Sequence, residues 1–137
     1  MAGFPIPTTP DVYDLPTFKL RIIRALRLVA VATSSKADHR PELDRLFGSE
    51  NAANAFLGLL KRCSRHWPDP IMVQPPCCRQ TSFDEILIAD LVTAVTRDDR
   101  AQFDRLLCEM IDRNGRDELH EAFQLFVRPL PSAQKAR

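Results

Sequence analysis

The chain has 137 residues, of which 45% are hydrophobic and 27% charged, and its formal net charge at pH 7 is +1. This length is enough for a single domain with its own core, and the balanced charge provides no overall field that would favour nucleic acid or a membrane surface. The sequence has no apolar run of about eighteen residues and does not begin with a secretory signal pattern, so we expect a cytoplasmic protein with reduced thiols.

The first part of the chain predicts an extended arm followed by a long basic helix. Pro5, Pro7 and Pro10 favour an extended, polyproline-like arm over residues 1–14. Asp14 is a suitable N-cap for a helix that continues to about Thr33. Apolar residues recur at helical spacing on its inward side: Leu15, Phe18, Ile22, Leu26 and Val29.

Local start and stop signals predict the remaining helices. A short helix over residues 41–47 is closed by Gly48, and Ser49 caps the next helix, which Pro68 and Pro70 end. Ser82 and Glu85 have the spacing of a capping box. The inward residues of these helices are Ala53, Phe56, Leu57, Leu60, Cys63 and Trp67, then Leu87, Leu91, Ala94 and Val95.

The last third of the chain predicts two more helices. Asp98 or Asp99 caps a fourth long helix, which Asn114-Gly115 ends, and a fifth runs from about residue 116 to residue 127. Residues 129–137 read as a flexible tail. The chain is therefore predicted to be one all-α domain over residues 1–137, a compact bundle of four to five helices with an N-terminal arm.

The stretch from residue 68 to residue 82 contains four of the eleven prolines and two of the four cysteines. Cys63 and His66 lie three residues apart at the end of the preceding helix, and Cys77 and Cys78 follow. Three thiolates and an imidazole are a ligand set for tetrahedral zinc, so these four residues form a candidate metal site. The interpretation that the residues favour is that the cysteines are packed and act only as small apolar side chains, because adjacent cysteines reach one ion together with difficulty. A redox-responsive Cys77-Cys78 pair is the remaining alternative.

The same stretch resembles a family of small alphaproteobacterial-type helical proteins of unknown function that carry a Pro-Cys-Cys loop. The matching residues are Pro70-Ile71, Cys77-Cys78, Arg79 and Thr81, together with the earlier helix over residues 18–31. The resemblance covers roughly residues 18–95 and implies an α-helical fold without indicating an activity. One departure is Pro76, which stands where many of those proteins have the first of three consecutive cysteines.

No Gly-rich phosphate loop, His-Glu-x-x-His sequence or serine nucleophile motif is present, so we predict that the chain is not an enzyme and requires no cofactor. The first helix carries apolar residues among its arginines, which favours protein contact or self-association as the function. The predicted contact residues are Leu20, Arg24, Arg27, Leu28 and Val31. A DNA-associated regulator that uses the same basic helix is the remaining alternative, although the small basic surplus disfavours nucleic acid as a partner.

Overall fold

The structure, a computed structural model, describes residues 10–36 and 38–131, and this part of the chain is all-helical. A short 3-10 helix, η1 (Val12–Asp14), precedes α1 (Thr17–Ser35), α2 (Arg40–Phe47), α3 (Glu50–His66), α4 (Phe83–Thr96), α5 (Arg100–Leu107) and α6 (Arg113–Val127). The prediction of an all-α fold is confirmed, although the described residues form six α-helices rather than four or five. Of the arm predicted over residues 1–14, residues 1–9 lie outside the described residues, and residues 12–14 form η1 rather than an extended segment. Of the tail predicted over residues 129–137, residues 132–137 lie outside the described residues.

Several of the predicted helix ends are confirmed by their capping contacts. Gly48 ends α2 with φ of 65°, a left-handed conformation that glycine adopts without strain. The Ser49 side chain accepts a hydrogen bond from the backbone N–H of Ala52 at the start of α3. Ser82 and Glu85 form the complete capping box at the start of α4.

Two of the predicted helix boundaries are wrong. Asp14 does not cap α1, because it belongs to η1, which Asp11 caps, and α1 begins after Pro16. Asn114-Gly115 does not end a helix, because α5 stops at Leu107 and Gly115 lies in the first turn of α6. The backbone N–H of Gly115 donates to the Asp112 carboxylate at 2.8 Å, so Asp112 is the N-cap that starts α6 there.

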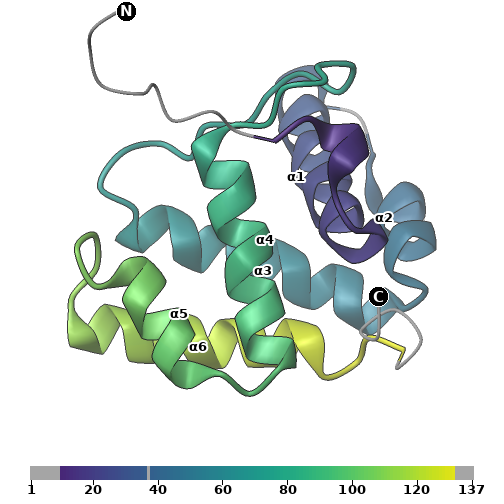
Figure 1. Cartoon of the computed structure of the whole chain (residues 1–137). Helices are drawn as coiled ribbons and strands as arrows, with labels where there is room; N and C mark the ends of the chain where they lie inside the picture. Colours follow the sequence, from purple (N-terminus) through teal and green to yellow (C-terminus); the bar gives the residue numbers. More distant parts are fainter. Residues whose placement is uncertain (1–9, 37, 132–137) are drawn as a thin grey trace, which may run out of the picture.

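The helices pack around one hydrophobic core. α3 and α6 lie side by side, α4 packs across α6, and α1 packs against α4 and α2 (Figure 1). Phe47, Phe56 and Phe126 join α2, α3 and α6, with ring centroids 4.9–5.2 Å apart. Leu130 is also buried in this core, so the polypeptide that the sequence assigned to a tail from residue 129 packs on the body at least to Leu130.

The loop between α3 and α4, residues 67–82, is called the cysteine loop below. It leaves the end of α3, passes over the C-terminal end of α1 and returns to the start of α4 (Figure 1). No helix within residues 10–36 and 38–131 is both long enough and apolar enough to cross a membrane.

Candidate docking groove and cysteine loop

A buried ion pair between α1 and α4 lies under the cysteine loop. Arg27 Nε donates to Glu85 Oε2 at 2.8 Å, and Arg27 Nη2 donates to Glu85 Oε1 at 3.1 Å. The side chains are 4% and 0% exposed. The hydrogen bond with Glu85 raises the pKa of Arg27 above its ordinary value, against the opposing effect of burial. This two-bond geometry is the kind that compensates for removing both charges from water.

The same pair holds the loop backbone. Arg27 Nη1 donates to the Cys78 carbonyl at 2.6 Å, and Nη2 donates to the Gln80 carbonyl at 3.2 Å. Glu85 accepts from the backbone N–H groups of Gln74 at 3.2 Å and of Ser82 at 2.8 Å. The pair therefore satisfies loop donors and acceptors that would otherwise be unpaired beside the core.

Sequence reasoning missed this role of Arg27, which it assigned to an exposed contact surface. Ile23 lies on the same face of α1 as Arg27, one turn earlier, and its side chain is 0% exposed. Because residues four apart lie on one helix face, an apolar Ile23 was the local signal that position 27 faces inward. The partner, Glu85, lies 58 residues away, and the sequence carries no local signal for that contact.

The second attachment of the loop is to residues 10–13. The N–H of Val12 donates to the Arg79 carbonyl at 2.7 Å, and the hydroxyl of Thr81 donates to the Pro10 carbonyl at 2.7 Å. The Arg79 guanidinium lies 5.3 Å from the ring centroid of Tyr13. The Val12 hydrogen bond, together with a backbone hydrogen bond from the N–H of Thr81 to the Pro10 carbonyl at 3.4 Å, forms the isolated antiparallel bridge between Asp11 and Gln80, which closes the loop against the start of the described chain.

The four cysteines differ in accessibility. Cys77 and Cys108 are exposed, Cys78 is partly buried and Cys63 is buried, and all four are free thiols. The N–H of Cys78 donates to the Pro75 carbonyl at 3.0 Å, so the vicinal cysteines sit in a tight turn. Burial raises the pKa of the Cys63 thiol to about 12, which keeps it protonated and unreactive at neutral pH.

The residues of the candidate metal site do not converge. His66 Nε2 lies 2.8 Å from Glu118 Oε2, and Cys63 belongs to the hydrophobic core. Within the described residues, no three or more His, Cys, Asp or Glu side chains are grouped so that they could hold a metal ion. Of the four candidate ligands, only the neighbours Cys77 and Cys78 lie together. The zinc hypothesis stays a prediction.

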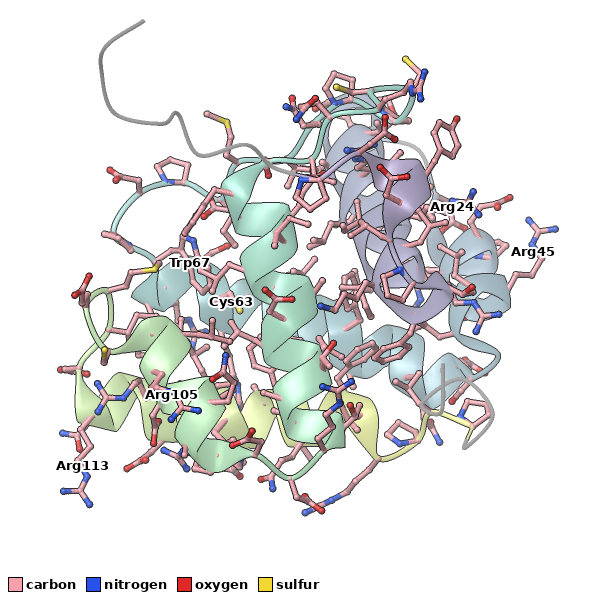
Figure 2. All side chains as sticks on the ribbon, viewed as in Figure 1. Arg24, Arg45, Cys63, Trp67, Arg105 and Arg113 are labelled. Carbon is pink, nitrogen blue, oxygen red and sulfur yellow. The ribbon has the colours of Figure 1, made fainter. Side chains whose placement is uncertain are left out.

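A groove runs between the C-terminal half of α1, the end of α3 and the cysteine loop. Its larger hollow has a volume of about 670 Å³, and a second hollow of about 430 Å³ adjoins it, with Ala30 and Val73 lining both. The larger hollow is lined by Leu26, Val29, Ala30 and Thr33 of α1, by Leu60, Ser64 and Trp67, and by residues 68–71 and 73 of the loop. Figure 2 shows Trp67 at the end of α3, with Cys63 one turn earlier.

The predicted contact residues of the first helix fall partly on this groove. Val31 is 42% exposed and lines the second hollow. Arg24 and Leu28 line a third hollow of about 250 Å³, which meets the second at Pro76. Arg27 also borders the third hollow, but its guanidinium is committed to Glu85 and the loop. Leu20 lies earlier on the helix and is partly buried.

The basic charge of α1 is smaller than its sequence suggests. In addition to the Arg27–Glu85 pair, Lys19 Nζ lies 2.7 Å from Asp90 Oδ1 of α4. Two of the four cations on this helix are therefore neutralised by acidic side chains of α4, and a DNA interface on α1 would depend mainly on Arg21 and Arg24.

No protein-family model, no curated protein sequence and no solved structure matches this chain.

Proposed function

We propose that this protein is a non-catalytic protein-interaction module that receives a segment of another protein in the groove between α1, α3 and the cysteine loop. The observation that supports this proposal is the lining of the larger hollow, in which Asp69 is the single charged residue. A groove with aliphatic and aromatic walls and few polar groups binds ligands by burying their apolar surface.

The size of the groove favours a protein segment. The two adjoining hollows follow α1 from Leu26 to Ser35, a length of about 14 Å at the helical rise of 1.5 Å per residue. This length suits two turns of a bound helix or a few residues of an extended chain. The walls are fixed independently of any partner, because the loop is held by Arg27, Glu85 and the contacts of residues 10–12.

The experiment that tests this function is a random-peptide display selection against the full chain, followed by binding measurements on the selected peptides. Trp67 is the only tryptophan and lines the groove with 7% of its surface exposed, so a change in its fluorescence is a readout of occupation at this site. Thr33→Glu puts a carboxylate in the groove from an exposed position, and a ligand that buries this charge should bind at least about tenfold more weakly.

The matched control is Thr17→Glu, the same substitution at an exposed position on the same helix but outside the groove. Selected peptides should bind this variant as they bind the original chain and should shift the Trp67 emission. If no peptide is enriched, or if the enriched peptides bind Thr33→Glu without loss, the groove is not a docking surface.

A further inference from the structure

The charges beside the groove identify the chemistry of its partner. Lys61 and Arg65 of α3 are exposed, and each directly follows a residue of the groove wall, Leu60 or Ser64. On α3, residues four apart lie on one face, and the Leu60–Ser64 face of the groove wall has a neighbouring face on each side. The face with Leu59 and Cys63 is buried in the core, so the face with Lys61 and Arg65 is the one between the groove wall and solvent. The α3 side of the groove is therefore basic.

The α1 side of the groove also carries positive charge. Lys36 is exposed and directly follows Ser35, which lines the second hollow. α1 contains no acidic residue, and α3 contains none after Glu50. Two acids lie on the loop side: Asp69 lines the larger hollow, and Asp84 accepts hydrogen bonds from Trp67 Nε1 at 3.2 Å and from the Met72 N–H at 2.8 Å. The two helix sides of the groove carry only cations at this point.

We propose that the partner is an amphipathic helix whose apolar side chains fill the groove and whose flanking residues are Asp or Glu. This inference rests on the proposed function and specifies the partner of the same groove. Apolar anchors at positions i, i+3, i+4 and i+7 of a helix span about 10.5 Å, which fits within the length of the groove. Acidic flanks then lie opposite Lys36, Lys61 and Arg65.

A second copy of the chain fits this groove less well. The exposed large hydrophobic residues within the described part of the chain are Tyr13, Val31, Met72, Phe83 and Leu125. Each lies on a different element, so no helix there offers a row of exposed apolar anchors at the required spacing. The acidic helix is therefore assigned to a different protein.

Three helix-stabilised probe peptides of equal length test this inference by titration of the full chain, with Trp67 fluorescence as the readout. The first has Leu at i, i+3, i+4 and i+7 and Glu elsewhere, the second has Lys in place of Glu, and the third has the Leu and Glu residues of the first in scrambled order. The acidic amphipathic probe should bind at least about tenfold more tightly than either of the others, and its advantage over the Lys probe should shrink as salt concentration rises.

The charge requirement is tested by the double variant Lys61→Gln, Arg65→Gln. Affinity for the acidic probe should fall about three- to tenfold, as expected for the loss of two exposed ion pairs, while affinity for the Lys probe should not fall. The matched control is Arg105→Gln, Arg113→Gln, which removes two exposed cations from α5 and α6 outside the groove (Figure 2). Affinity for the acidic probe should stay the same in this control.

The outcomes distinguish a failure of the acidic-helix inference from a failure of the proposed docking function. Equal or tighter binding of the Lys probe or of the scrambled probe overturns the acidic-helix inference, while peptides from the display selection that occupy the groove still support docking. If deletion of residues 2–9, which include Phe4 and Ile6, made every probe bind about tenfold more tightly, the deleted segment would be a competitor for the groove and therefore its occupant. A dimer in sedimentation that Thr33→Glu dissociates would make a second copy the occupant, and either result overturns the inference.

Discussion

Cys63 illustrates how one side chain couples the core of this protein to pH. The thiol has no exposed surface, and burial raises its pKa from 9.0 to about 12. In the unfolded chain the same thiol ionises near 9.0. Since the folded pKa is the higher one, the stability associated with Cys63 is complete below pH 9 and is lost between pH 9 and about pH 12.

We predict that Cys63→Ala removes part of the alkaline sensitivity of the protein. Between pH 8 and pH 10 the original chain should lose about 1.4 kcal/mol more of its free energy of unfolding than the variant does, because one pH unit of differential ionisation corresponds to about 1.4 kcal/mol. Urea unfolding at both pH values measures the difference. The other three cysteines are common to both proteins and cancel, so an equal loss in the two proteins would show that Cys63 is not the group responsible.

At the scale of the elements, two glycines have opposite roles in helices. A Cβ added at Gly115 would lie 2.6 Å from Ile111 Cγ2, just before α6, and 3.0 Å from His66 Nδ1 at the end of α3, so this position needs glycine because both side chains crowd it. A Cβ added at Gly58, on the exposed side of α3, would meet nothing within 4 Å. Gly58 therefore carries only the entropic cost of glycine in a helix.

The two substitutions to alanine should change stability in opposite directions. Gly58→Ala should raise the free energy of unfolding by about 0.5–1 kcal/mol through helix propensity. Gly115→Ala should lower it by about 1–3 kcal/mol, because the crowded Ile111 and His66 side chains must move. Urea denaturation followed by circular dichroism compares the pair, and each variant is the control of the other. A Gly115→Ala protein as stable as the original would show that the α3–α6 approach does not depend on this glycine.

The helix boundaries show which features of the elements are readable from sequence. The capping contacts of Gly48, Ser49 and the Ser82–Glu85 box are local, involving residues within four positions, and all of them were predicted. The boundary between α5 and α6 was predicted wrongly because Asn114-Gly115 has the composition of a helix stop. A Cβ at Gly115 would meet Ile111, four residues earlier, and His66 at the end of α3, and the second of these contacts is invisible without the fold.

Only part of the candidate groove could be predicted from the sequence. Apolar residues among the cations of the first helix led to the prediction that Leu28 and Val31 contact a partner; the structure places both beside hollows, and the contact itself stays a prediction. The main hollow could not be predicted, because its walls come from α1, α3 and the loop, and the loop wall is held by the Arg27–Glu85 contact between residues 58 positions apart.

At the scale of the whole molecule, two kinds of interaction stabilise two parts of the fold. The helices α3 and α6 are joined through packed aromatic rings, in which Phe56 lies 5.2 Å from Phe126. The cysteine loop is joined to α1 and α4 through polar contacts that converge on Arg27 and Glu85. Aromatic packing is spread over many atoms, whereas the central polar attachment of the loop converges on one ion pair, so the two parts should respond differently to a substitution of Arg27.

We predict that Arg27→Met releases the cysteine loop and leaves the aromatic core folded. The substitution leaves the Glu85 carboxylate buried without its cation, which should lower the free energy of unfolding by about 3–5 kcal/mol. Hydrogen exchange should show near-complete loss of protection at the amides of Gln74 and Cys78, while the amide of Phe123 in α6 stays protected.

The control for this experiment is Arg24→Met, one turn away on the exposed side of α1, which should change stability by less than about 0.5 kcal/mol. Loop amides that stay as protected in Arg27→Met as in the control would mean that the guanidinium is not the attachment of the loop. Loss of protection at Phe123 as well would mean that loop and core unfold as one unit. Selective loss would show that one buried ion pair holds the loop wall of the groove. Probe binding by Arg27→Met should then weaken even though Leu60 and Ser64 of the α3 wall remain in place.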